Sequence, residues 1–456
     1  MNNSKLLISI FLITFCFLGF NLHAQEARYR WEMLNLIRQE KFDLVLPKAM
    51  RENKVDMWIH VMGDGRPDPL LLDLADPLAL DVGGTIVGRR TVYFIFKDRG
   101  GDRIERAILG AEGKTKGYDI FGRKEDLKKF VAERDPKRIA VNFSKNLAAA
   151  DGISHTQYLE LVKELGKKYA QRIVSAENVI TDFRVQRVQT EIIAFAKACE
   201  LQRQIVEEGL RNIKPGVTTR EDFGWWIEDK ALAKGLGVEF GMVLPGIIHS
   251  EVSNPAECRK PDYVLQRGDL LVFDWGVKYL NFGTDYKRYA YILKEGETSL
   301  PAGVQKAWDR TLQAREIIRK TIKVGRTAGE TLEAIAQALE KEGFVYTPFT
   351  DIGSKDRELV NSLGDSEKSG FSIDCHCVGN TGHGDIVVGP SIAPFRKDRA
   401  HIKIKPNNLF AFEFMVHTWI PEWGKRLTIN LEDNAIVTER GVEFLYPPNE
   451  RIILVH

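Results

Sequence analysis

The chain has 456 residues, with 65 lysines and arginines against 63 aspartates and glutamates, and 44% of its residues are hydrophobic. At roughly 150 residues per domain, this length predicts two or three domains. The net charge of +2, without a long block of one sign, argues against nucleic acid or an anionic membrane as a partner. The composition indicates an ordinary globular protein.

Residues 1–24 are typical of a secretory signal peptide. Lys5 precedes an apolar stretch from Leu6 to Phe20, and the small residue Ala24 follows. This stretch is short for a membrane span, so we expect cleavage after Ala24 and a secreted or periplasmic protein without a stable span. An uncleaved anchor is the alternative. Cleavage removes Cys16, and the cysteines that remain are too few for a disulfide framework in so long a chain.

Residues 25–180 are predicted to form a small α/β domain. The apolar spacing predicts a helix in "YRWEMLNLIRQEKF", and "DLVLPKAMRENKVDMWIHV" is expected to begin as a helix and close as a strand. Two further strands are predicted in "RTVYFIF" and "RIAVNFS".

Residues 181–456 contain a pattern that repeats. The motif Gly-x-Thr-x-x-Glu follows a long helical segment in "IKPGVTTRE" (Ile213 to Glu221) and again in "IKVGRTAGE" (Ile322 to Glu330). In each copy the glycine ends one helix, and we expect Thr218 and Thr327 to cap the next with the glutamate three residues on. The repeat predicts a duplicated unit with internal pseudo-symmetry.

Five acidic or histidine residues interrupt apolar, strand-like runs in this second region. A buried carboxylate is costly unless it is paired or bound to a metal, and two aspartates on a hairpin, one histidine and two glutamates can hold two divalent ions between them. Taken singly, an aspartate after a strand is more often a turn former and a histidine is more often a core residue. The five candidates are Asp274, Asp285, His376, Glu413 and Glu432.

The order of these residues resembles the pita-bread metallopeptidases, which comprise aminopeptidase P, prolidase and methionine aminopeptidase, with creatinase as a relative. The Asp to Asp interval, the His-x-x-Gly-x-x-x-His spacing of "HCVGNTGH" and the ending "EDNAIVT" carry the resemblance. It implies a creatinase-like α/β N-terminal domain over residues 25–180 and an α+β pita-bread catalytic domain over residues 181–456.

The same resemblance implies a role for each site residue. Asp285 and Glu432 would bridge two ions, Asp274 would bind one of them, and His376 and Glu413 would bind the other. Glu413 would also carry the proton to the leaving nitrogen. The remaining implied catalytic residues, expected to act on the substrate carbonyl and the developing oxyanion, are His249 and His383.

Four positions depart from the family pattern around the expected metal site. Gly384 follows His383 where relatives often have an acid, and Phe414 follows Glu413 where many have proline. Asn430 stands where proline-specific members tend to have arginine, and Ser372 stands where aminopeptidase P has an additional histidine. The metal ligands are complete, whereas the residues that would choose the substrate differ. The reaction type is therefore predicted more firmly than the substrate.

Cys375 and Cys377 flank His376 and invite a thiolate–metal interpretation. On a strand they point away from the face that His376 occupies, so we interpret them as packing residues. The charged segment from Ser354 to Gly370 is predicted to be a solvated loop, with a position at the border of the cleft as the alternative. His417 lies outside any motif and is predicted to be an ordinary residue.

The predicted function is hydrolysis of a peptide bond, with Xaa-Pro substrates as one option, or of another amide bond, through a hydroxide that bridges two ions. Manganese and zinc both suit a carboxylate-rich site with one imidazole. A non-catalytic pita-bread binding or scaffold protein and a hydrolase of a non-peptide small molecule are the alternatives. The resemblance also implies a homodimer.

Overall fold

The structure is a computed structural model that describes residues 26–63, 68–75, 91–101, 103–111, 115–239, 243–252, 256–348, 354–380 and 388–456. The segment predicted as a signal peptide and the predicted catalytic residue His383 lie outside these ranges. The chain divides into two compact units: the described residues up to Lys145 with Ala150–Val179, and Asn146–Ala149 with Ile180–His456.

The first unit is built on a sheet with the strand order β4-β3-β2-β1-β5-β6. Residues 26–40 are helical, and the other helices of this unit include α2 (Leu46–Glu52), α4 (Leu127–Arg134) and α5 (His155–Ala170). The strands predicted from apolar runs are confirmed as β1, β2 and β5. The strands are β1 (Met57–Met62), β2 (Val92–Asp98), β3 (Ile104–Leu109), β4 (Ile120–Gly122), β5 (Ile139–Val141) and β6 (Ile173–Ser175).

The second unit contains two principal sheets. One has the order β20-β12-β9-β8, and its strands are β8 (Gly246–His249), β9 (Leu270–Trp275), β12 (Tyr286–Ile292) and β20 (Ile453–Val455). The other has the order β13-β14-β17-β15-β16, with β18 paired to both β17 and β19. Its strands are β13 (Val345–Tyr346), β14 (Gly370–Ile373), β15 (Cys375–Cys377), β16 (Ser391–Ile392), β17 (Leu409–Ile420), β18 (Lys425–Thr438) and β19 (Gly441–Phe444).

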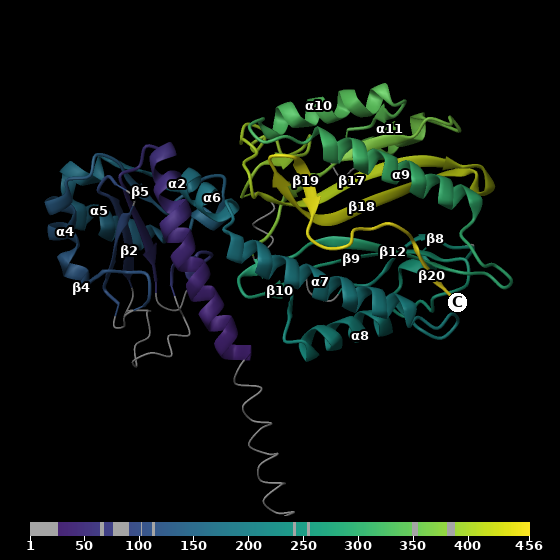
Figure 1. Cartoon of the computed structure of the whole chain (residues 1–456), viewed down its shortest axis with the longest axis horizontal. Helices are drawn as coiled ribbons and strands as arrows, with labels where there is room; N and C mark the ends of the chain where they lie inside the picture. Colours follow the sequence, from purple (N-terminus) through teal and green to yellow (C-terminus); the bar gives the residue numbers. More distant parts are fainter. Residues whose placement is uncertain are drawn as a thin grey trace, which may run out of the picture. The chain divides into compact units, whose positions relative to one another are not determined.

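Helices cover these sheets from outside. Figure 1 shows α9 (Ala302–Thr321) and α10 (Ala328–Lys341) over the sheet of β17 and β18, with α7 (Gln189–Arg211) and α8 (Arg220–Ala233) below β9 and β12. A small sheet of β7 (Gly237–Val238), β10 (Val277–Tyr279) and β11 (Phe282–Gly283) lies near α7. The arrangement confirms the predicted α+β class of this region.

The predicted repeat is present in the backbone. Gly216 donates its N–H to the carbonyl of Leu265, and Gly325 makes the equivalent bond to Ile404. Both glycines have a positive φ, at 74° and 91°, which a residue with a side chain rarely adopts.

The helix cap of the second copy is Thr327, as predicted, and its hydroxyl accepts from the N–H of Glu330. In the first copy the predicted cap Thr218 is wrong, because one extra residue separates the glycine from the helix. The cap there is Thr219, whose hydroxyl accepts from the N–H of Asp222.

The two principal sheets of the second unit are joined by side chains that cross between them. The hydroxyl of Tyr289, on β12, accepts from the N–H of Asn430 and donates to its carbonyl, each at 2.7 Å, on β18. One side chain therefore completes both backbone bonds of a residue in the opposite sheet. The buried Trp275 and Trp308 pack in the same unit and add apolar area to its core.

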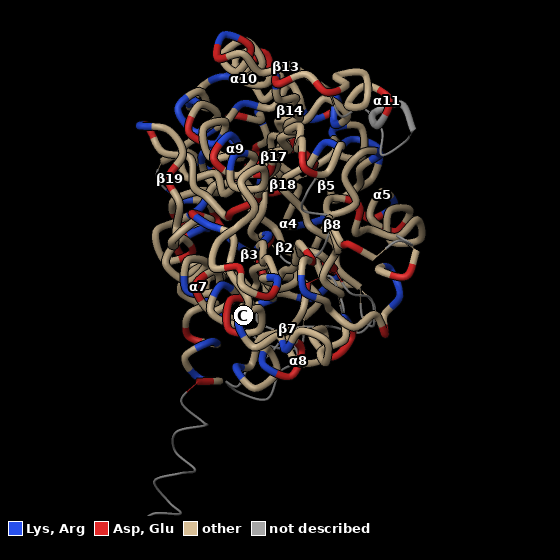
Figure 2. The backbone as a smooth tube through the Cα atoms, turned by 90° about the vertical axis from the view of Figure 1, so that its right-hand side faces the viewer, with Lys and Arg blue, Asp and Glu red and all other residues tan. Residues whose placement is uncertain are grey.

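Three features bear on the sequence predictions. Within the described ranges, no helix has the length and hydropathy of a membrane span. The cysteines of the described residues are buried free thiols, as expected for too few cysteines to form a disulfide framework. They are Cys199, Cys258, Cys375 and Cys377. Figure 2 shows basic and acidic positions intermixed along the backbone, as the balanced composition suggests.

Candidate metal centre

The first part of the centre is a pair of aspartates on the hairpin of β9 and β12. Asp274 lies near the end of β9, and Lys287 of β12 pairs directly opposite it. Asp285 immediately precedes β12, and its N–H donates to the amide oxygen of Asn434 at 3.1 Å. Because residues two apart on a strand share a face, Asp285 and Lys287 extend from the same face of this sheet.

The second part comes from the other sheet. Glu413 on β17 pairs directly with Glu432 on β18, and His376 on β15 pairs with Ala411, two residues before Glu413. The three ligand candidates of this sheet therefore lie on adjacent strands. All are buried. The apolar residues between them pack on the opposite face, which is why each ligand interrupts an apolar run.

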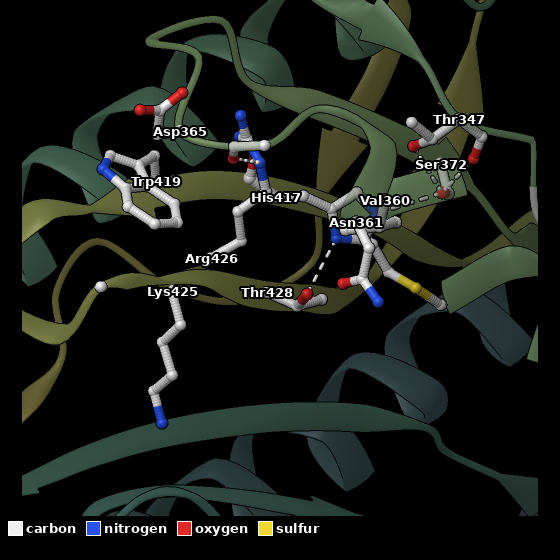
Figure 3. Close-up of a pocket in the computed structure, with 13 residues that line it drawn as sticks. Thr347, Val360, Asn361, Asp365, Ser372, His417, Trp419, Lys425, Arg426 and Thr428 are labelled. Carbon is white, nitrogen blue, oxygen red and sulfur yellow. Dashed lines mark hydrogen bonds between the residues drawn. The ribbon is translucent and has the colours of Figure 1, made fainter. Parts of the chain in front are cut away.

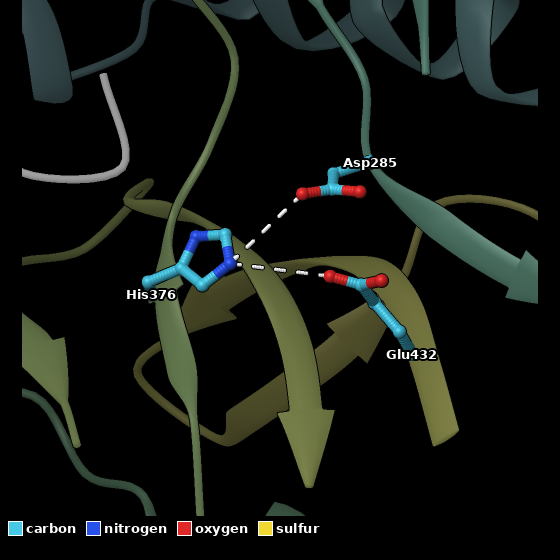
Figure 4. Close-up of side chains that lie close together, drawn as sticks. All are labelled: Asp285, His376 and Glu432. Atoms are coloured by element: carbon cyan, nitrogen blue, oxygen red, sulfur yellow. Dashed lines mark ion pairs between the residues drawn. The ribbon is translucent and has the colours of Figure 1, made fainter. Parts of the chain in front are cut away.

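The two parts meet in a cluster of three ligand side chains. One ligand atom from each of Asp285, His376 and Glu432 lies within 4.8 Å of the others (Figure 4). The Nε2 atom of His376 is 3.9 Å from Asp285 Oδ2 and 3.9 Å from Glu432 Oε1. The structure thus brings together three of the five predicted ligands around one point.

Glu413 lies beside this cluster. Its Oε2 atom is 3.6 Å from the Nε2 atom of His376, and its Oε1 atom accepts from the side-chain amide of Asn430 at 2.8 Å. Asp274 is different, because 48% of its side chain is exposed. Its carboxylate contacts Lys287 at 3.2 Å.

The donor set fits a divalent metal ion. Among the residues that the structure describes, the buried Oε1 atom of Glu432 has no hydrogen-bond partner, which is costly unless a cation compensates it. The Nδ1 atom of His376 lies 3.1 Å from the carbonyl of Cys377, and donation there leaves Nε2 as the ligand atom, the arrangement usual for metal-binding histidines. The hydrogen bond to Cys377 thus favours the His376 tautomer with its proton on Nδ1.

The electrostatics of the cluster reflect buried negative charge. Burial, with repulsion from Asp274, raises the pKa of Asp285 to about 7. Burial and repulsion from Asp285 also raise the pKa of Glu432 well above its ordinary value. Burial alone would raise the pKa of Glu413 too, but Lys287 and His376 outweigh it and hold that pKa low. A bound cation would favour the ionised form of all three carboxylates.

Lys287 is the residue that sequence reasoning missed. Its ammonium lies 2.8 Å from Glu413 Oε1 and 2.5 Å from Glu432 Oε2, and it also contacts Asp274. In the stretch "DYKRYAYI" Lys287 and Arg288 are two adjacent basic residues of a strand, and nothing in the spacing distinguishes Lys287. Only the pairing with Asp274 and the approach of the other sheet reveal its position.

Of the two predicted catalytic histidines, His249 lies in the described part of the chain, and it is not among the clustered ligand atoms. His249, at the end of β8, stacks on Trp423 with ring centroids 3.7 Å apart, and burial lowers its pKa to about 4. Trp423 belongs to the turn between β17 and β18 (Pro421–Trp423, η6), so His249 faces the tip of that hairpin. His383 lies outside the described residues, and its assignment stays a prediction.

The two cysteines beside His376 make other contacts. The thiol of Cys375 donates to the carbonyl of Glu413 at 3.2 Å, and Cys377 packs against Gly389. Neither belongs to the group of clustered ligand atoms. The strand alternation accounts for this, because His376 alone extends from the face that carries Glu413 and Glu432.

A cavity of about 580 Å³ lies along the same sheet face (Figure 3). The register of β17 and β18 is regular, so Met415, His417 and Trp419 follow Glu413 on one face. Asn430, opposite Met415, separates the cavity lining from the two glutamates. The cavity is lined by Thr347, Val360, Asn361, Gly364, Asp365, Ser372, Met415, His417, Trp419, Gly424, Lys425, Arg426 and Thr428.

The charged segment from Ser354 to Gly370 borders this cavity. Its first part forms helix α11 (Ser354–Ser362), so the prediction of a loop is wrong there. Arg426 holds the part that follows, because its guanidinium donates to the carbonyls of Leu363, Gly364 and Ser366. The alternative expectation, a place at the edge of the cleft, agrees with this cavity.

His417, predicted to be an ordinary residue, lines the cavity. Its Nδ1 atom is 2.8 Å from the Thr428 hydroxyl, and its Nε2 atom is 3.3 Å from the Ser372 hydroxyl. Burial, assisted by the charge of Arg426, lowers the pKa of His417 to about 4. The neutral imidazole is therefore part of the folded structure.

We expect this depressed pKa to make stability pH-dependent. The unfolded chain takes up a proton at His417 near pH 6.5, whereas the folded protein resists it, so stability is complete above that pH and declines towards about pH 4. The contribution at stake is roughly 3 kcal/mol. Urea unfolding at about pH 7.5 and about pH 4.5 measures it. His417→Gln should lose this part of the slope, and an unchanged slope would contradict the assignment.

Comparisons with known proteins agree with this geometry. The model for metallopeptidase family M24 matches residues 194–439. The chain is 24% identical over 298 residues to a Xaa-Pro dipeptidase of Pyrococcus furiosus, covering 64% of this chain and 72% of that protein. It is 23% identical over 285 residues to methionine aminopeptidase 1 of Saccharomyces cerevisiae, covering 57% of this chain and 63% of that protein. The match spans less than two thirds of the yeast relative.

Solved structures extend the similarity over most of the chain. The X-Pro aminopeptidase of Thermotoga maritima has a TM-score of 0.57 and 17% identity, covering 90% of this chain and 100% of that one. The prolidase of Pyrococcus horikoshii has a TM-score of 0.52 and 17% identity, covering 91% of this chain and 100% of that one. At these identities the structures establish similarity of fold.

Proposed function

Because the chain belongs to metallopeptidase family M24, we propose that it is a metal-dependent hydrolase of peptide bonds. The observation that carries the proposal is the convergence of Asp285, His376 and Glu432 from three separate strand segments on one point. Such convergence of buried ligands would be costly without a cation. Manganese or zinc suits the two carboxylates and one imidazole.

The ion and the residues around the cluster would have different roles in hydrolysis. A bound divalent ion supplies Lewis acidity, which polarises a carbonyl oxygen and makes water more acidic. Glu413 is the carboxylate placed to take a proton from water and to pass it to the leaving nitrogen. Lys287 and Asn430 both contact its Oε1 atom, which leaves Oε2 directed towards His376.

The cavity along β17 and β18 is the proposed substrate site. Its lining begins at Met415, two residues after Glu413 on β17, and extends towards Trp419, and the proposal is that a substrate bound there extends past Asn430 to the metal centre. Two relatives are named for Xaa-Pro substrates, which supports testing Xaa-Pro peptides first. Export through residues 1–24 and a homodimer are part of the proposal as sequence-based expectations.

The direct test compares reconstituted and metal-free protein. Purified protein loaded with Mn²⁺ or Zn²⁺, and the same protein treated with chelator, would be incubated with Xaa-Pro dipeptides, matched Xaa-Ala dipeptides and simple amides and esters. Metal-dependent release of amino acids supports the proposal. Turnover of only the non-peptide compounds would favour a small-molecule hydrolase, and neither metal binding nor turnover would favour a scaffold protein.

Filling the cavity should impair the reaction without affecting the metal. We expect Met415→Trp to lower kcat/KM by about 10- to 100-fold, because a changed fit in an apolar pocket is worth roughly 1–3 kcal/mol. Met415→Leu keeps the volume and serves as the matched control. Steady-state kinetics with parallel metal analysis measures the effect. Unchanged kinetics in the tryptophan variant would place the substrate elsewhere.

A further inference from the structure

Lys287 lies where carboxylates from both sheets converge. It follows Asp285 by two positions on β12 and pairs with Asp274 on β9, and its ammonium reaches across to Glu413 and Glu432 on the other sheet. The side chain is buried, with 9% of it exposed. It therefore binds acidic residues of both halves of the candidate metal centre.

The two carboxylate oxygens of each glutamate face different partners. Glu413 Oε1 and Glu432 Oε2 contact the ammonium of Lys287 at 2.8 and 2.5 Å. Their other oxygens, Glu413 Oε2 and Glu432 Oε1, lie 3.6 and 3.9 Å from the Nε2 atom of His376. One side of the pair thus faces an ammonium, and the other faces the histidine and Asp285.

This division conflicts with the two ions that the family resemblance implies. The ion that the resemblance assigns to Asp274, with Asp285 and Glu432 as bridging ligands, would lie about 2.0–2.2 Å from an oxygen of each. The ammonium nitrogen already lies 3.2 Å from an oxygen of Asp274 and 2.5 Å from Oε2 of Glu432. An ion and the ammonium would occupy the same space, and both are positively charged.

The ammonium of Lys287 also reduces charge repulsion within the sheet of β17 and β18. Glu413 and Glu432 are directly opposite each other on β17 and β18, and like charges in that position destabilise a sheet. A cation between them removes the repulsion. Lys287 supplies that cation from within the chain.

We propose that this protein binds one divalent ion, at Asp285, His376 and Glu432, and that the ammonium of Lys287 replaces a second ion. The proposal rests on the metal centre of the proposed function and deepens it. Asp274 is then a partner of Lys287 and not a metal ligand. Glu413 stays outside the group of three ligands and is free to carry a proton.

The test is the number of ions that the full chain binds. Protein would be stripped with chelator, saturated with Mn²⁺, freed of excess metal and analysed for bound ions per chain. We expect one equivalent in the wild type and two in Lys287→Ala, which vacates the space. Electron paramagnetic resonance should show magnetically isolated Mn²⁺ in the wild type and an exchange-coupled pair in the variant.

The number of ions bound by the wild type tests the proposal of a single ion even if Lys287→Ala fails to fold. Two equivalents in the wild type would overturn the inference and leave the proposed function intact, whereas no binding would overturn both. One equivalent in folded Lys287→Ala would overturn the role given to Lys287. The control is Lys278→Ala, an exposed lysine on β10, which should bind metal as the wild type does.

Discussion

Replacing Asp285 with asparagine is expected to abolish peptide hydrolysis and to leave the purified protein with little bound metal. Asp285 is one of three side chains whose ligand atoms converge, and an amide there removes a negative charge next to the ion. Loss of a group that merely supports a ligand lowers metal affinity by about 10- to 100-fold, so loss of a ligand should exceed that range. The expectation holds for one ion or two.

Metal titration and activity should be measured together on this variant. Asp433→Asn is the matched control, because Asp433 is also a buried aspartate but accepts from Arg288 and extends from the other face of β18. That variant should lose stability and keep its metal, since breaking a buried ion pair is destabilising. Normal turnover with normal metal content in Asp285→Asn would refute the metal centre.

Replacing Glu413 with glutamine is expected to lower kcat by about 10²- to 10⁴-fold, the usual contribution of a positioned acid–base group. The protein should still bind its ion, because Glu413 is not among the three clustered ligands. An amide keeps the shape of the side chain and can neither take nor pass the proton. The bond from Asn430 to Oε1 can persist in the variant.

The readouts are kcat on the best substrate and metal content by elemental analysis. Glu439→Gln, an exposed glutamate just after β18, serves as the control and should match the wild type in both. Loss of the ion from Glu413→Gln would make Glu413 a ligand. Unchanged kcat would assign proton transfer to another group.

The candidate ligands His376, Glu413 and Glu432 were predictable because each is a polar residue in an apolar strand. Burial of Glu413 and Glu432 requires a compensating cation, and the sequence displays both the run and its interruption. Lys287 was not predictable in the same way. It lies in β12 beside a second basic residue, Arg288, and its role depends on strand register and on the approach of a second sheet, neither of which can be inferred from local spacing.

The differences in local structure have similar causes. The motif predicted Thr218 as a helix cap, but one inserted residue moved the cap to Thr219, which spacing alone does not reveal. The charge of the segment after Ser354 suggested a loop, although a short helix with polar residues has the same composition. His417 was predicted to have no special role. Its place beside the cavity follows from the alternation of side chains along β17, and the cavity itself is not visible in the sequence.

The bond between Tyr289 and Asn430 has a consequence for the order of folding. These residues are 141 positions apart, and contacts so distant form late, because closing a long loop costs entropy before the contact stabilises the chain. We therefore expect the two halves of the candidate metal centre to meet late in folding. A nascent chain that has emerged as far as β12 carries Asp285 without His376 or Glu432 and lacks a tight binding site. We therefore expect metal capture to follow folding and ion affinity to depend on the integrity of the whole second unit.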